Sequence, residues 1–120
     1  MKGKKILIID DNPLQLISVK GLLGSYGYEV FTAEESLEAV MIVAQHEINL
    51  IVLDIEMPTV NGFQLMKFLI RKGIRIPVLL FSSHDGNGIQ LMGEELGAVG
   101  FLSKPIDSES FLSLVKDILN

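Results

Sequence analysis

Short, nearly pure apolar runs bounded by polar or turn residues are the feature that most constrains how this chain can fold. Four runs are clear and a fifth is weaker; they cover residues 6–9, 50–53, 78–81, 99–102 and, less clearly, 29–31. Strands that are apolar at every position, rather than at alternate positions, are typical of parallel sheets covered on both faces. The runs therefore predict the strands of a buried parallel sheet.

Segments with helical periodicity separate these runs. The first predicted helix has Asn12 as its N-cap and Pro13 at its first position, and its apolar pattern runs through Leu14, Ile17 and Leu22. The second, at about 36–45, has four apolar residues at helical spacing: Leu37, Val40, Met41 and Ala44. The others are expected at about 63–71, at about 88–96 and after an N-cap at Asp107. Glycines within 86–93 weaken the fourth helix, so we expect it to shift readily.

Strand and helix thus alternate five times. This alternation predicts an α/β fold, a doubly wound five-stranded parallel sheet with five helices and right-handed crossovers. A chain of 120 residues has the size of one ordinary domain and can bury a core of its own. We therefore expect a single domain over residues 1–120.

Composition and charge exclude several classes of function. The chain has no cysteine, which excludes a disulfide framework, thiolate zinc and cysteine nucleophiles. Its two histidines, His46 and His84, are too few for most histidine metal sites. A net charge of -5 makes direct binding to nucleic acid or to an anionic membrane unfavourable. No apolar run is long enough for a signal peptide or a bilayer span, so we expect a soluble cytoplasmic protein.

Polar residues follow the predicted strands at the edge where ligands bind in open α/β sheets. The first strand is followed by Asp10 and Asp11, the third by Asp54, the fourth by Ser82 and Ser83, and the fifth by Ser103, Lys104 and Pro105. Because the carboxyl ends of parallel strands meet at one edge, we expect three carboxylates, two hydroxyls and an ammonium group to converge there.

Three crowded carboxylates repel one another, so either some are protonated or a cation lies among them. Mg²⁺ suits a set of oxygen ligands and keeps coordination positions open for a phosphate. Lys104 and Ser82 would then contact phosphoryl oxygens. A carboxylate beside Mg²⁺ and a lysine can act as a nucleophile and form an aspartyl phosphate.

These residues fall in motifs that resemble the receiver domain of two-component response regulators, over essentially the whole chain. The motifs are Asp10-Asp11-Asn12-Pro13, LDIEMPTVNG at 53–62, PVLLFSS at 77–83 and GAVGFLSKP at 97–105. The resemblance implies a flavodoxin-like sheet with strand order 2-1-3-4-5. It also implies a signalling phosphoacceptor that labels itself and loses the phosphoryl group slowly, rather than a turnover enzyme.

The resemblance implies a role for each matching residue. Asp54 would be the phosphoacceptor, and a histidine kinase or a histidine phosphotransfer protein would be the donor. Mg²⁺ would be bound by Asp11, Asp54 and the backbone carbonyl of Glu56, with Asp10 acting through a metal-bound water. Lys104 would pair with the phosphoryl group, next to a cis peptide bond before Pro105.

The resemblance also implies a conformational switch. Ser82 would be the switch hydroxyl and Phe101 the aromatic residue that rotates with it; Thr and Tyr are frequent in the family at these positions. Ser83 stands where Ala is common, and Glu56 and His84 occupy variable positions that flank the path of the attacking water. An output domain, a target protein or a second copy of the chain would bind the face formed by the fourth helix, the fifth strand and the fifth helix.

Two other kinds of function remain as alternatives. One is a receiver-like interaction module that works without phosphorylation; such modules usually lack an acidic residue or the lysine, and this chain has all of them. The other is a turnover enzyme at the same edge, such as an aspartyl-phosphate hydrolase, or a binder of a flavin or a nucleotide. Asp54-Ile55-Glu56 only approximates the Asp-x-Asp of such hydrolases, and the acidic loop 10–13 disfavours a mononucleotide.

Overall fold

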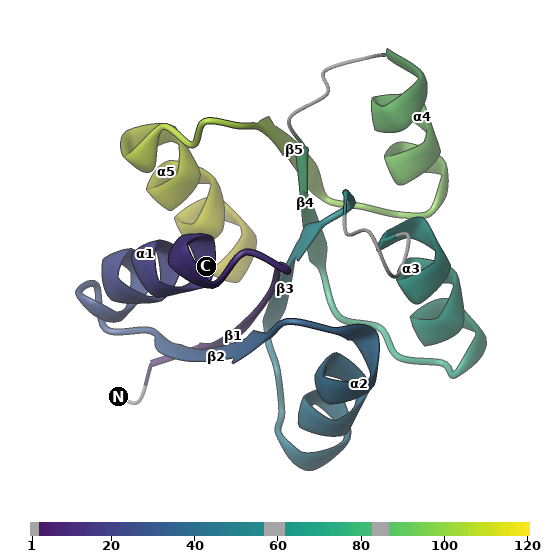
Figure 1. Ribbon diagram of the computed structural model, residues 1–120, viewed down its shortest axis with the longest axis horizontal. Helices are drawn as coiled ribbons and strands as arrows, with labels where there is room; N and C mark the ends of the chain where they lie inside the picture. The colour runs from purple at the N-terminus through teal and green to yellow at the C-terminus, as the bar shows by residue number, and fades with distance from the viewer. Residues whose placement is uncertain (1–2, 57–61, 83–86) are drawn as a thin grey trace.

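The computed structural model describes residues 3–56, 62–82 and 87–120 of the chain (Figure 1). The strands are β1 (Lys5–Ile9), β2 (Glu29–Ala33), β3 (Leu50–Asp54), β4 (Val78–Ser82) and β5 (Gly100–Ser103). The helices are α1 (Pro13–Gly24), α2 (Ser36–Gln45), α3 (Gly62–Arg71), α4 (Asn87–Glu95) and α5 (Ser108–Leu119). The motif residues 57–61, together with Ser83 and His84, lie outside the described residues.

The five strands form one parallel sheet in the order β2-β1-β3-β4-β5, which confirms the predicted fold and strand order. In the register of the sheet, Ile9 lies beside Leu53, Asp54 beside Phe81, and Ser82 beside Ser103. The carboxyl ends of β1, β3, β4 and β5 therefore lie at one edge, as the sequence predicts.

Helices cover both faces of the sheet: α1 and α5 lie on one side, and α2, α3 and α4 on the other (Figure 1). Side chains of β1 alternate between two core clusters, with Ile6 and Ile8 facing the first side and Leu7 and Ile9 the second. Because successive side chains of a strand point to opposite faces, a strand covered on both faces must be apolar at every position. This packing explains the continuous apolar runs.

The start of α1 confirms one prediction and corrects another. The Asn12 Oδ1 accepts hydrogen bonds from the backbone N–H groups of Leu14 and Gln15 at 3.0 and 3.4 Å, so Asn12 is the N-cap. Of the predicted apolar residues, Leu22 packs against the core, but Leu14 and Ile17 are 76% and 68% exposed, so the predicted face is wrong at these two positions. The fully buried residues of the helix are Leu16, Val19 and Leu23. It carries apolar residues on more than one face, so their spacing alone did not decide which stripe is buried.

The apolar pattern predicted for α2 is only partly buried. Val40 packs against the core beside the buried Ala39, whereas Leu37 and Met41 are 68% and 53% exposed, so core packing does not explain these two residues. In α5 the predictions hold: Asp107 caps the helix, Phe111 and Val115 are buried, and Leu114 and Ile118 pack against the same core cluster. Within the described residues, no helix is both long and apolar enough to cross a bilayer.

Candidate phosphoacceptor site

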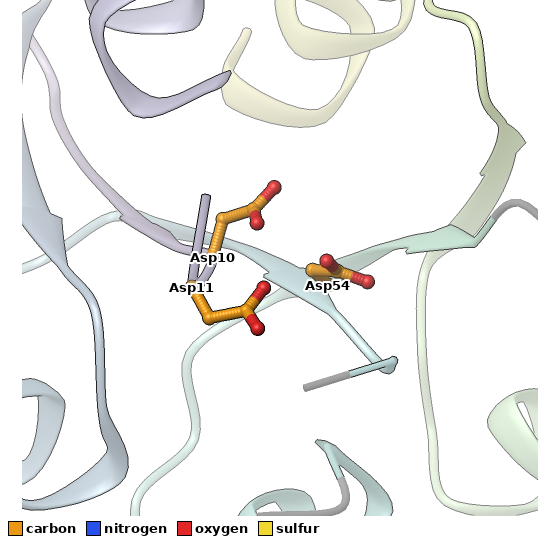
Figure 2. Close-up of side chains that lie close together, drawn as sticks. All are labelled: Asp10, Asp11 and Asp54. Carbon is orange, nitrogen blue, oxygen red and sulfur yellow. The ribbon is translucent and has the colours of Figure 1, made fainter. Parts of the chain in front are cut away.

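The three predicted aspartates come together where β1 and β3 end. Asp10 and Asp11 directly follow β1, and Asp54 is the last residue of β3. Figure 2 shows their carboxylates gathered in one place. One oxygen from each of the three side chains lies within 4.8 Å of the other two. Elsewhere among the described residues, no other group of three metal-ligating side chains comes this close.

Lys104 brings a positive charge to the two buried aspartates. Its Nζ lies 3.0 Å from Asp54 Oδ2 and 3.4 Å from Asp10 Oδ2. The backbone N–H of Lys104 donates to the carbonyl oxygen of Ser82 at 2.8 Å, which ties the residue to the end of β4. The peptide bond between Lys104 and Pro105 is cis, as predicted. The structure therefore places the ammonium group where the sequence predicts it.

Backbone N–H groups hold the two buried carboxylates in place. Asp10 Oδ1 accepts from the N–H of Asn12 at 3.0 Å, and Asp54 Oδ1 accepts from the N–H of Glu56 at 2.9 Å. In each case the donor lies two residues further along the chain, so the turn that leaves the strand also orients the aspartate. These hydrogen bonds position the side chains before any ligand binds.

Burial and like charge shape the titration of the site. Asp10 and Asp54 are only 1% and 3% exposed. Burial, together with the nearby Asp54, raises the pKa of Asp10 to about 6, although the Asn12 N–H and Lys104 act in the other direction. Burial lowers the pKa of Lys104, but its hydrogen bond to Asp54 and the charges of Asp54 and Asp10 outweigh this, so the pKa is raised. One ammonium against three carboxylates leaves the site with a negative charge.

The donor set fits a hard divalent cation. All three clustered side chains offer carboxylate oxygens, which are the ligands that Mg²⁺ prefers, and Asp11 is more exposed than the other two. Lys104 adds an ammonium group to the same cluster, 3.0 Å from Asp54. A divalent cation and an ammonium group beside one carboxylate suit the binding of an anion there.

The two predicted switch residues lie on neighbouring strands. Ser82 is fully buried at the end of β4, at the same edge as Asp54. Phe101 is half-buried in β5, where it pairs with Leu80 of β4 and lines a cavity of about 230 Å³ beside Gly93 of α4. One strand, β4, thus connects the acidic edge with the surroundings of Phe101.

Gly62, at the start of α3, is a positioning residue that the sequence analysis missed. A Cβ atom at this residue would lie 2.7 Å from Ile55 Cα and 3.2 Å from the Asp54 carbonyl oxygen. The contact with Ile55 Cα is shorter than real Cβ atoms show and the contact with the Asp54 oxygen is tight, so glycine lets α3 begin this close to the strand that carries Asp54. A glycine at the beginning of a predicted helix, where it lowers helix propensity, was the available signal.

Comparisons with known proteins agree with this geometry. Residues 6–116 match the family described as the response regulator receiver domain. Protein PilH of Pseudomonas aeruginosa is 31% identical over 117 residues, which cover 96% of this chain and 97% of PilH. The alkaline phosphatase synthesis transcriptional regulatory protein PhoP of Bacillus subtilis is 32% identical, but this chain spans only 49% of its length.

Solved structures give the same result. The chemotaxis protein CheY4 of Vibrio cholerae superposes with a TM-score of 0.90 at 28% identity, covering 98% of this chain and 99% of that one. The family match spans most of the chain, and the matched residues include all three aspartates and Lys104. The chain therefore belongs to the response regulator receiver domain family.

Proposed function

We propose that this chain accepts a phosphoryl group on Asp54 in a Mg²⁺-dependent reaction, with a histidine kinase or a histidine phosphotransfer protein as the donor. The observation that carries the proposal is the surroundings of Asp54, whose carboxylate lies within 4.8 Å of oxygens of Asp10 and Asp11 and 3.0 Å from the ammonium of Lys104. This arrangement supplies a nucleophile, a cationic group and a set of carboxylates that a divalent cation can bind.

The chain's own residues would divide the work of transfer among them. An oxygen of Asp54 attacks the phosphorus atom, the bond from phosphorus to the donor nitrogen breaks, and the electron pair leaves with the donor. Lys104 Nζ, now on Asp54 Oδ2, would move to a phosphoryl oxygen, and the Ser82 hydroxyl would donate to another. Bound Mg²⁺, held by Asp11, Asp54 and the Glu56 carbonyl with Asp10 behind a water, would neutralise charge on the phosphoryl oxygens.

Signalling would follow from the movement of Ser82 toward the phosphoryl group. Ser82 ends β4, the strand that pairs with β5, and Leu80 of β4 lies beside Phe101 of β5. A displacement of Ser82 would therefore change the packing between β4, β5 and α4 around Phe101. Leu91 and Met92 of α4 and Val99 before β5 are 57%, 43% and 48% exposed. We propose that this apolar face binds an output domain, a target protein or a second copy of the chain when Asp54 is phosphorylated.

The whole of residues 1–120 would act as one receiver domain in the cytoplasm. The sheet order and both core clusters draw on elements from β1 to α5, so no part of the described chain forms a separate core. The chain has no cysteine and so makes no demand for an oxidising compartment. Because it spans only half the length of PhoP, the regulatory output is not carried over from that relative.

Labelling with a small phosphodonor tests the proposal. The purified protein is incubated with acetyl phosphate and Mg²⁺, and its intact mass is measured. We expect the mass to rise by one phosphoryl group, and we expect chelation of Mg²⁺ to prevent this. Asp54→Asn should remain unlabelled, whereas the matched control Asp117→Asn, at an exposed position of α5, should be labelled like the original protein.

Two outcomes would count against the proposal. Undiminished labelling of Asp54→Asn would show that another residue accepts the phosphoryl group. A folded original protein that stays unlabelled and shows no saturable NMR shifts near Asp11 and Asp54 with Mg²⁺ would instead support the phosphorylation-independent interaction module.

A further inference from the structure

A second hollow lies between α3 and the end of α4, at the edge of the sheet where β4 and β5 begin. Its volume is about 600 Å³, within the range of small-molecule pockets. Asp54, Ser82 and Lys104 lie at the other edge, where the strands end, and none of them lines this cavity. The proposed phosphoryl transfer therefore makes no use of it.

The walls of the cavity are largely apolar and incompletely covered. Met66, Leu69 and Ile70 of α3 line one side, and Leu96 after α4 lines the other. Ile70 is 51% exposed although it is a large aliphatic residue. Leu96 and Ile74, which also line the cavity, are only partly buried. Apolar surface left in water in the walls of a cavity favours a ligand that fills it.

Two opposite charges line the same cavity from different elements. Arg75 lies in the connection from α3 to β4, and Glu95 is the last residue of α4. Within the described parts of the chain, neither side chain forms an ion pair. The carboxyl end of α4 adds a partial negative charge near Glu95. The cavity therefore offers a cationic group, an anionic group and an apolar wall to one ligand.

We propose that this cavity binds a small apolar zwitterion, with its carboxylate on Arg75, its ammonium on Glu95 and its apolar body against Leu69 and Leu96. A free apolar amino acid and a short apolar peptide both have this chemistry. A ligand held in this way contacts both α3 and the end of α4, a helix in which none of the large apolar residues Ile89, Leu91 and Met92 is fully buried. This site goes beyond the proposed function, because its occupancy does not depend on phosphorylation of Asp54.

NMR titration of the unphosphorylated 120-residue protein tests the proposal. The probes are L-phenylalanine, the dipeptide phenylalanyl-leucine, 3-phenylpropanoate, which lacks the ammonium, and phenethylamine, which lacks the carboxylate. We expect saturable amide shifts at Leu69, Ile70 and Leu96 with a Kd of about 1 mM, as is usual for ligands of this size. Both zwitterions should bind at least about threefold more tightly than either singly charged probe. The zwitterion that binds more tightly shows whether the natural ligand is a free amino acid or a short peptide.

Variants locate the binding to this cavity. Arg75→Gln should weaken binding of 3-phenylpropanoate, Glu95→Gln should weaken that of phenethylamine, and both should weaken that of L-phenylalanine. Ile70→Trp fills the mouth from an exposed position and should abolish binding without unfolding the protein. Arg71→Gln, whose side chain does not line the cavity, is the matched control and should bind normally.

The proposal is overturned if no probe gives saturable shifts at these residues. It is also overturned if the singly charged probes bind as tightly as the zwitterions, or if Ile70→Trp binds L-phenylalanine like the original protein. Because the titration uses unphosphorylated protein, these results are independent of whether acetyl phosphate labels Asp54.

Discussion

The ammonium group of Lys104 lies 3.0 Å from a carboxylate oxygen of Asp54 and 3.4 Å from one of Asp10. One cation that follows β5 thus bridges two buried anions, Asp10 just after β1 and Asp54 at the end of β3. Asp10 is only 1% exposed and Asp54 only 3%, so neither can rely on water to stabilise its charge. The chain tolerates an excess of buried negative charge at the place where we expect a divalent cation.

Replacing the cation should destabilise the metal-free protein. In Lys104→Met both aspartates lose their charged hydrogen-bond donor, and we expect the free energy of unfolding at neutral pH to fall by about 2 kcal/mol. Urea denaturation measures the difference. Lys67→Met, at an exposed position of α3, is the control and should change stability by no more than about 0.5 kcal/mol. Equal losses for the two variants would contradict the structural role of Lys104.

The raised pKa of Asp10 predicts a pH dependence of stability in the metal-free protein. The pKa is about 6 in the folded protein against an ordinary value of 3.8, so the folded state holds the proton more tightly than the unfolded chain does. The contribution of Asp10 to stability is therefore fully present below pH 3.8, and it is lost as the pH rises toward about 6. Above this window the loss stays constant.

Asp10→Asn should remove this loss. We expect the variant to be more stable than the original protein at pH 7 and close to it at pH 4, by thermal denaturation without metal. Asp117→Asn should match the original protein at both values. Added Mg²⁺ should then stabilise the original protein more than it stabilises Asp10→Asn, because the variant lacks one of the charges that bind the ion. If Asp10→Asn is less stable than the original protein at pH 7, the predicted direction of the pH effect is contradicted.

A side chain at position 62 should disturb the site through its scaffold. In Gly62→Ala the new methyl group would meet the backbone of Ile55 at 2.7 Å, so α3 or the end of β3 must move. We expect a loss of about 1–3 kcal/mol in stability and slower labelling by acetyl phosphate. Gly21→Ala has open space within α1 and should raise stability by about 0.5–1 kcal/mol. Labelling of Gly62→Ala by acetyl phosphate at the rate of the original protein would contradict this role of Gly62.

Two neighbouring residues of α1 test which face of this helix is buried. Leu16 is 6% exposed and packs in the core, so Leu16→Ala should cost about 2–5 kcal/mol. Ile17 is 68% exposed, and Ile17→Ala should cost about 0.5 kcal/mol or less. Chemical denaturation of both variants gives the comparison. A larger loss of stability for Ile17→Ala than for Leu16→Ala would show that the face predicted from the sequence is the buried one.

Much of the fold and the main residues of the site could be predicted from the sequence, because each depends on a local signal. Continuous apolar runs follow from burial on both faces of the sheet, and the residue after each run lies at the shared edge by the geometry of parallel strands. Asn12 and Asp107 were recognised as caps because a cap needs a side-chain acceptor at one defined position.

Features that depend on how elements pack could not be predicted in this way. Residues such as Leu14 and Leu37 are apolar yet exposed, because α1 and α2 each carry more apolar residues than one buried stripe holds. The restriction at Gly62 comes from the backbone of Ile55, the residue that follows β3. The raised pKa of Asp10 depends on its burial and on Asp54, which lies far away in the sequence.

The most direct test of the central claim is a crystal structure of the protein with Mg²⁺ and beryllofluoride, which imitates a phosphoryl group on a carboxylate. We predict beryllium on the Asp54 carboxylate, Mg²⁺ bound by Asp11 and Asp54, and Lys104 Nζ in contact with a fluoride. An empty acidic pocket, with the ammonium of Lys104 turned away from Asp54, would contradict the account.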